Sequence, residues 1–154
     1  MAHVFDRAQD PPSAGFATER LRLRPFAEKD LESFAAYRRD PEVARFQSWD
    51  AEAYTLEKAK QLFETSCQEF NVPGTWYQMA VADAETDELV GDCAIHFLED
   101  GQQVEIGYTL AREHQGKGFA REAVDSLVHF LFFVLKKRRI AATTDVLNAR
   151  SVTG

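Results

Sequence analysis

The sequence predicts an α/β (α+β) fold built on one β-sheet. Three segments between residues 75 and 110 are separated by short turn signals, which is typical of antiparallel strands joined in a meander. Two other segments, 27–39 and 118–135, repeat apolar residues at helical spacing. The predicted order of elements is therefore β-α-α-β-β-β-α-β, in one domain without an internal repeat.

The N-terminal segment is expected to be a leader followed by a strand. Residues 1–17 include Asp10-Pro11-Pro12 and show no periodicity, so we expect a flexible leader and a single domain over 18–154. From Leu21 to Pro25, apolar residues alternate with arginines, which is typical of a half-exposed strand.

Two helices are expected before the meander. The first, 27–39, is expected to end at Pro41, because the residue before a proline is disfavoured in a helix. Its apolar positions at helical spacing are Leu31, Phe34, Ala35 and Tyr37. The second is expected over 51–70 and is closed by Asn71-Val72-Pro73-Gly74. Its inner face would consist of Leu56, Ala59, Leu62 and Phe63.

The remaining elements are strands and one long helix. The predicted meander strands cover 75–82, 88–98 and 102–110. Their turns fall at 83–87 and at Glu99-Asp100-Gly101. The helix over 118–135 is followed by a last predicted strand over 139–146.

Composition limits the class of protein. The 154 residues, 45% of them hydrophobic, are enough for one domain with a real core. Lys and Arg number 18 and Asp and Glu 25, so the formal net charge is −7, which argues against general affinity for nucleic acid. Cys67 and Cys93 are expected to be reduced and buried, and the four His show no metal-ligand spacing, so no metal is expected.

Targeting signals are not evident. The longest apolar run, 127–135, is too short to cross a bilayer, and the N-terminus lacks the pattern of a signal peptide. We therefore expect a cytoplasmic protein with no membrane partner.

The most specific signal is a strand, Val104–Leu110, followed by a glycine-bearing turn and a helix. Gly116 and Gly118 lie in this turn, and the apolar run begins at Phe119. The order places free backbone N–H groups at a helix N-terminus, where the helix dipole also favours an anion. The sequence therefore predicts a phosphate-bearing ligand, although a plain turn before a helix is the alternative.

Two common phosphate motifs are excluded. A Walker A loop needs glycine at 111 and Ser or Thr at 118, where this chain has Ala111 and Gly118. A dinucleotide fingerprint needs a small residue at 121, where this chain has Arg121.

The pattern that remains is Gln-x-x-Gly-x-Ala, at Gln115, Gly118 and Ala120. It resembles the acetyl-CoA pyrophosphate loop of the GNAT N-acetyltransferase superfamily. Three other segments resemble, in the same order, the branch that contains the ribosomal-protein alanine N-acetyltransferases. They are Thr18–Phe26, Asp40–Val43 and Asn148–Ser151. We therefore identify the chain as resembling that branch over about residues 18 to 151.

The resemblance implies a mixed, mostly antiparallel sheet flanked by helices, with acetyl-CoA as co-substrate and no metal. It implies cofactor contacts from Ile106, Gly107, Tyr108, Leu110, Gln115, Gly116, Lys117, Gly118, Phe119, Ala120 and Asn148. Glu105 would be the general base, an amide near Gly107 or Tyr108 would hold the oxyanion, and Ser151 would donate to the departing thiolate. A plain outward-facing carboxylate at Glu105 and a helix N-cap at Asn148 or Ser151 are the alternatives.

The acceptor implied is a primary amine, either a protein N-terminus or a small molecule. At pH 7 an α-amine with a pKa near 7.8 costs about 1 kcal/mol to deprotonate, against roughly 4.6 kcal/mol for a lysine. Trp49, Tyr54 and Trp76 are candidates for the acceptor cleft or for the core.

Family members usually continue through a further helix and two strands, which we expect to be missing after Gly154. Two other functions therefore stay open: a CoA-binding or interaction module without catalysis, and a fragment completed by domain swapping. A homodimer is also compatible with the sequence.

Overall fold

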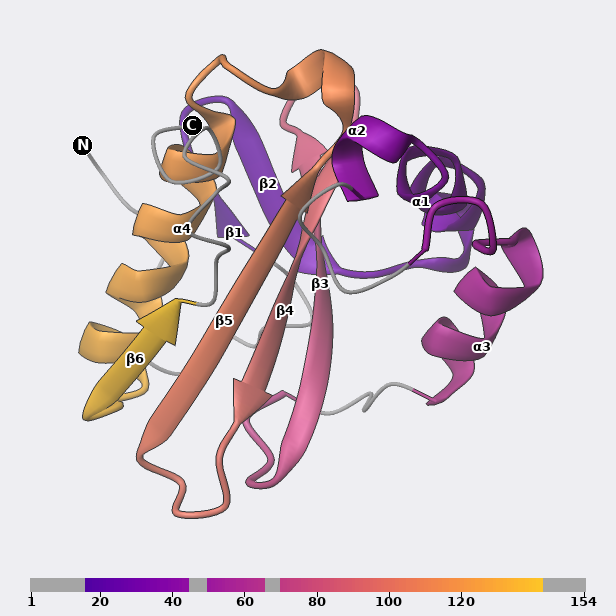
Figure 1. The fold of residues 1–154 in the computed structure, drawn as a ribbon. Coiled ribbons are helices and arrows are strands. Elements are labelled where there is room, and N and C mark those ends of the chain that lie inside the picture. The colour runs from indigo at the N-terminus through magenta and orange to yellow at the C-terminus, as the bar shows by residue number, and fades with distance from the viewer. Residues whose placement is uncertain (1–15, 45–49, 66–69, 143–154) are drawn as a thin grey trace.

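The computed structural model describes residues 16–44, 50–65 and 70–142 (Figure 1). In this part of the chain, six strands form one sheet in the order β1-β2-β3-β4-β5-β6. The strands are β1 (Phe16–Ala17), β2 (Leu21–Pro25), β3 (Thr75–Asp83), β4 (Leu89–Phe97), β5 (Gln103–Leu110) and β6 (Arg139–Ala142). The α-helices are α1 (Leu31–Arg38), α2 (Pro41–Ala44), α3 (Leu56–Thr65) and α4 (Phe119–His129).

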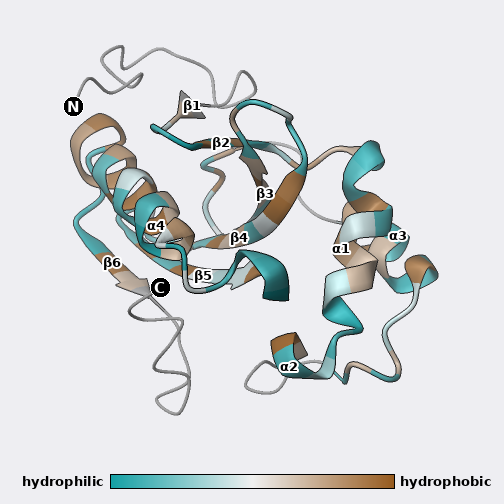
Figure 2. Ribbon diagram, turned by 90° about the horizontal axis from the view of Figure 1, so that it is seen from above, coloured by the Kyte–Doolittle hydropathy of each residue, from teal (hydrophilic) through white to brown (hydrophobic). Residues whose placement is uncertain are grey.

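The helices cover both faces of the sheet (Figure 2). On one face, α4 packs through Ala120, Ala123 and Leu127 onto strand residues that include Met79, Ile95 and Ile106. On the other face, α1 and α3 pack through a second buried cluster. Alternate residues of each strand therefore face different helices, as the period of two in a strand requires.

All neighbouring strands from β1 to β5 are antiparallel, and β6 alone is parallel to its neighbour β5. The connection from β5 to β6 crosses through α4, because parallel neighbours cannot be joined by a tight turn. The predicted fold class and the mixed, mostly antiparallel sheet are thus confirmed.

The predicted strands agree with β2 to β5 to within one residue at each end. The predicted leader is wrong at Phe16 and Ala17, which pair with Leu23 and Arg22 of β2 as strand β1. Residues 1–15 lie outside the described part of the chain.

The helix predictions need two corrections. Pro41 does not simply end the first helix: it is the first residue of α2, a position where proline's missing N–H costs nothing. The second helix begins at Leu56 rather than at residue 51, because the Thr55 hydroxyl caps it by accepting a hydrogen bond of 3.1 Å from Lys58 N–H. Residues 66–69 lie outside the described part.

The end of the described chain follows the prediction closely. The helix expected over 118–135 is α4 followed by a π-helical turn, Phe130–Val134. The last strand is described over Arg139–Ala142, and residues 143–146 lie outside the described part. Cys93 is buried, as predicted, while Cys67 is not among the described residues.

Candidate functional site

The turn between β5 and α4 has the geometry of an anion site. A single 3-10 turn, Arg112–His114, follows β5, and Gly116 and Gly118 then adopt left-handed φ values of 78° and 81°. Only glycine takes this conformation without strain. Glu122 N–H donates to Gly118 O at 3.0 Å. The amides of the α4 residues before it have no acceptor within the helix and are left for solvent or a ligand.

Arg20 braces this turn from outside. Its Nε donates to Glu122 Oε1 at 2.7 Å, and its Nη1 donates to Lys117 O at 2.9 Å. The guanidinium also lies over the Phe119 ring, 4.6 Å from the centroid. A side chain next to β2 therefore holds both the turn and the first turn of α4. Sequence reasoning assigned Arg20 no role, because its partners are distant in the chain.

The predicted cofactor residues are brought together along β5 and this turn. Gln115 Nε2 donates to Leu110 O at 3.2 Å, which ties the turn back to the strand. The side chains of Ile106, Leu110 and Ala120 are buried, so these residues can offer a ligand only backbone groups. At Gly107, an added Cβ would meet no atom within 4 Å. Lys117 is exposed, and Tyr108 and Phe119 are half-buried.

One edge of β5 is only partly paired in the described structure. Strand β6 pairs with Gln103 through Ile106, and its described residues end opposite Ile106. Figure 1 shows β6 beside the first half of β5. The following residues of that edge, from Gly107 on, have no described strand beside them.

Glu105 lies on the sheet face turned away from α4, with its side chain 43% exposed. Its carboxylate Oε1 is 2.9 Å from Nδ1 of His96, the residue opposite on β4. Sequence reasoning missed His96. The turn at Glu99-Asp100-Gly101 could have predicted this pairing, because that hairpin determines which β4 residue lies opposite Glu105.

The aromatic candidates separate into two groups. Tyr54 is buried in the cluster under α1 and α3, so it belongs to the core. Trp76 is 53% exposed and stacks on the His96 ring, so it is not part of the core. Trp49 lies outside the described residues, as do the predicted site residues Asn148 and Ser151.

A buried polar cluster anchors α1 to the same sheet face. Asp92 of β4 accepts hydrogen bonds from the Tyr37 hydroxyl, from Gln78 Nε2 at 2.6 Å and from Arg38 Nη2 at 3.3 Å. Burial raises the pKa of Asp92 and also that of Tyr37, because both charged forms lose solvation. The cluster fixes α1 over the sheet beyond the open space at Gly107.

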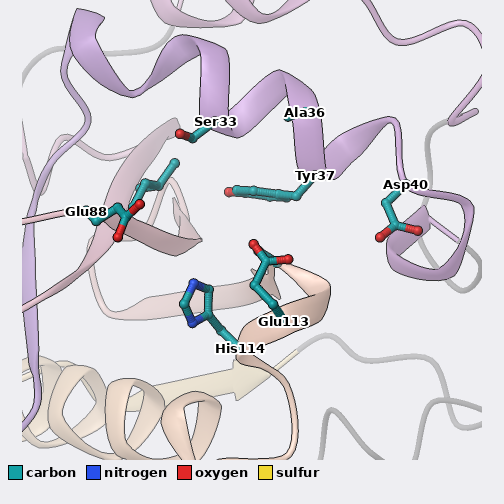
Figure 3. A pocket seen from close by; sticks show the side chains of 9 residues that line it. Ser33, Ala36, Tyr37, Asp40, Glu88, Glu113 and His114 are labelled. Carbon is teal, nitrogen blue, oxygen red and sulfur yellow. The ribbon is translucent and has the colours of Figure 1, made fainter.

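A pocket of about 220 Å³ lies between α1 and the Arg112–His114 turn (Figure 3). Its lining includes Tyr37, His114 and the carboxylates of Asp40, Glu88 and Glu113. These carboxylates would repel a phosphate, so the pocket does not suit the predicted anion. It is also remote from Glu105, since Ala111, which lines the pocket, lies six positions further along the chain, or roughly 20 Å in extended backbone.

Among the described residues, no three His, Cys, Asp or Glu side chains are grouped as a metal ion would need. Within the same part of the chain, no helix combines the length and apolar character of a membrane span.

Known proteins that this chain resembles in sequence and in fold include acetyltransferases. The sequence profile of the family described as "Acetyltransferase (GNAT) domain" matches residues 20–153. The p20 protein of Bacillus licheniformis, named as an uncharacterized N-acetyltransferase, is 32% identical over 137 residues, covering 88% of this chain and 75% of that protein. A GNAT-family acetyltransferase from Bacillus anthracis superposes with a TM-score of 0.75 and 26% identity, covering 88% of this chain and 76% of that one.

A more distant likeness concerns the fold alone. Spermidine N-acetyltransferase from Vibrio cholerae, solved with CoA and spermine, has a TM-score of 0.73 at 20% identity, covering 88% of this chain and 77% of that one. The profile match reaches from just before β2 to beyond β6 and so includes the glycine turn, β5 and α4. The predicted family is confirmed by these matches, and the chain belongs to the GNAT acetyltransferases.

Proposed function

We propose that this chain transfers the acetyl group of acetyl-CoA to a primary amine, with Glu105 as general base. The observation that carries the proposal is the pair of features on β5. The strand presents a half-exposed carboxylate at Glu105, and it leads into the left-handed glycine turn at the N-terminus of α4. One strand thus connects an anion site to a proton acceptor.

The phosphates of the co-substrate are assigned to the turn over Gln115–Ala120. Left-handed Gly116 and Gly118 carry no side chain that could keep a phosphate from the backbone. Each contact with the helix terminus contributes only about 0.3–1 kcal/mol when exposed, so several amides must act together. Lys117, exposed in the same turn, adds a positive charge.

The acyl arm is assigned to the stretch of β5 from Gly107 to Leu110, which leads directly into the glycine turn. From Leu110 back to Glu105 is about 17 Å of strand, which the arm must span. Asn148 is proposed to hydrogen-bond the arm, and Ser151 to donate a hydrogen bond to the departing thiolate. Acetyl-CoA supplies an activated acetyl group at this stretch.

The chemistry asked of the chain is modest. The acceptor attacks as the neutral amine, and Glu105 accepts the proton that its nitrogen loses on bonding to the acetyl carbon. A backbone N–H near Gly107 or Tyr108 stabilises the oxyanion that forms on the acetyl carbonyl. An α-amine needs about 1 kcal/mol to become neutral at pH 7, so a protein N-terminus needs less help than a lysine side chain. Small-molecule amines are the second acceptor class, as in the spermidine acetyltransferase that shares the fold.

The test combines binding with turnover. Acetyl-CoA is titrated into the protein by calorimetry, and a panel of peptides with free N-termini, polyamines and amino sugars is assayed for acetylation. Glu105→Gln is expected to keep the affinity for acetyl-CoA within about twofold and to lower kcat by about 10²–10⁴, the range typical of a general base.

Glu85→Gln is the matched control, since Glu85 is an exposed carboxylate in the turn between β3 and β4. It should leave both binding and rate unchanged. Tight binding of acetyl-CoA without acetylation of any amine would indicate a CoA-binding module instead. An unchanged rate in Glu105→Gln would remove the assignment of the base.

A further inference from the structure

Three side chains form a row across the sheet at the end remote from α1. Trp76 of β3 lies opposite His96 of β4, and His96 lies opposite Glu105 of β5. The Trp76 and His96 rings are stacked, with centroids 4.5 Å apart and planes 5° apart. His96 Nδ1 is 2.9 Å from Glu105 Oε1. The row therefore links an indole to the proposed base through a single imidazole.

The row shares a sheet face with the Asp92 cluster, because His96 and Asp92 are four residues apart on one strand. Between them lies a row with two small residues, Ala94 and Gly107, opposite each other on β4 and β5. A Cβ added to Gly107 would meet no atom within 4 Å. In the described structure, Glu105 thus borders open space in which an acceptor has room.

Trp76 is exposed for so large an apolar side chain. It lies before Met79, the first β3 residue that pairs with β2, so only β4 is described beside it, and it is 53% exposed. Its contact with His96 is a flat stack rather than packing into the core. The contact gives the imidazole a fixed plane, in which its Nδ1 meets the Glu105 carboxylate.

We infer that His96 is a positioning residue for Glu105, and that Trp76 holds the His96 ring in the plane this requires. The inference rests on the proposed function, in which Glu105 is the base. A glutamate on an open strand rotates about several bonds, and fixing it costs entropy. A hydrogen bond from the stacked His96 ring fixes the Glu105 carboxylate before the acceptor arrives. The entropy cost of fixing it is therefore not part of the reaction barrier.

The hydrogen bond also selects the oxygen that takes the proton. An ionised carboxylate can only accept, so the hydrogen of this pair is on His96 Nδ1. Oε1 is engaged by that bond, and Oε2 takes the proton that the acceptor nitrogen loses as it bonds to the acetyl carbon. The carbon–sulfur bond breaks and its electron pair leaves with the thiolate. His96 keeps its own hydrogen throughout, in either protonation state of Nε2.

Two substitutions at one position test the role. Asn at 96 can donate an amide N–H from about the place of Nδ1, whereas Leu fills similar space and donates nothing. We expect His96→Leu to lower kcat at least tenfold, with the affinity for acetyl-CoA unchanged, and His96→Asn to keep at least a third of the rate. A purely structural role would lower both variants alike or move the affinity and the unfolding midpoint as well.

A double mutant separates action through Glu105 from action elsewhere. In a Glu105→Gln background, His96→Leu should cost no further rate, because there is no base left to position. The inference would be overturned if the fold-loss in rate of the double mutant equalled the product of the losses of the two single mutants. A wild-type rate in His96→Leu would also overturn it. Trp76→Phe, which keeps a ring for stacking, should retain more rate than Trp76→Leu.

A spectroscopic measurement tests the pair without turnover. Nitrogen NMR of the imidazoles, with His96→Asn used for assignment, should show the Nδ1–H tautomer at His96 in the neutral state. The same resonance should shift in Glu105→Gln. The Nε2–H tautomer would overturn the inference. If the Nδ1–H tautomer is found but no amine is acetylated, the proposed function fails while the hydrogen-bonded pair stands.

Discussion

Arg20 and Glu122 lie 102 residues apart in the sequence, and their side chains meet at 2.7 Å beneath the glycine turn. Glu122 also accepts hydrogen bonds from the Thr18 hydroxyl and from Arg20 N–H at 2.9 Å. The first turn of α4 is therefore tied to the chain entering β2. The shape of the proposed phosphate site thus depends on a segment that precedes α4 by about a hundred residues.

Arg20→Gln is expected to weaken acetyl-CoA binding by about three- to tenfold, which corresponds to about 0.7–1.4 kcal/mol. The reason is that the turn loses the bond to Lys117 O and the stack on Phe119. Stability should fall by less than about 1 kcal/mol, because the Arg20 side chain is 45% exposed. Calorimetry and urea unfolding measure the two effects separately.

Arg121→Gln is the control for charge alone, since Arg121 is exposed next to Glu122 and only approaches Asp125, at 3.8 Å. It should change affinity by less than about twofold if the bracing contacts matter more than the net charge. Equal losses in the two variants would show that Arg20 acts only as a positive charge near the phosphates.

The ionisation of Glu122 should make part of the stability depend on pH. Burial alone would raise its pKa, but hydrogen bonds from Thr18 and Arg20 outweigh burial and lower the pKa below the ordinary 4.5. A carboxylate with a lower pKa in the folded chain stabilises the fold above its unfolded pKa, and this stabilisation disappears as the pH falls through the folded value. The difference in unfolding free energy between the protein and Glu122→Gln should therefore shrink below about pH 4.5. A difference that stays constant down to pH 3 would contradict this account.

At the left-handed Gly116, asparagine should be tolerated better than alanine. At Gly116 an added Cβ meets no atom within 4 Å, so only the φ of 78° resists a side chain there. The cost of that conformation is about 1–2 kcal/mol for alanine and less for asparagine. We expect acetyl-CoA affinity to decrease from the wild type to Gly116→Asn and then to Gly116→Ala, as measured by calorimetry. Equal affinity in all three proteins would show that the turn need not keep this shape.

Gly91 and Gly107, on the paired strands β4 and β5, should differ in how much stability is lost when each is changed to alanine. An added Cβ at Gly91 would lie 2.2 Å from Thr109 O and 3.0 Å from Leu110 Cα, which are backbone atoms that cannot move aside. Gly91→Ala should therefore destabilise the fold by about 1–3 kcal/mol or more. Urea unfolding measures this loss.

Gly107→Ala should change stability by less than about 0.5 kcal/mol, because the new methyl meets open space. That space adjoins Glu105, so the expected effect is a lower kcat/KM for the amine. Wild-type kinetics in Gly107→Ala would place the acceptor elsewhere on the sheet.

The central strands could be predicted because local chemistry determines them. Turn residues at 83–87 and 99–101 separate apolar runs, and hairpins of that length need no distant partner. The same reasoning could have paired His96 with Glu105. The glycine turn was predictable for a related reason, since glycine adopts without strain the left-handed conformations that a sharp turn between a strand and a helix needs.

Contacts distant in sequence could not be predicted. The apolar pattern does not reveal that Asp92, in the middle of β4, is buried and held by Tyr37 and Arg38 of α1. Pro41 was interpreted as a terminator because the rule for the residue before proline says nothing of a helix that begins there. Strand β1 has only two residues and exists through its pairing with β2, which no local pattern encodes.

The six described strands lie in the sheet in the order in which a ribosome synthesises them. Each of these strands can thus add to an edge that already exists, and none of them must insert between two that came before. Among the described strands, the longest connection between two paired strands runs from β2 to β3, through α1 to α3. Short turns connect β3 to β4 and β4 to β5. Rates of folding rise as contacts become more local. We therefore expect β3 to β5 to assemble first, with protection from hydrogen exchange appearing there before β2 and β6 dock.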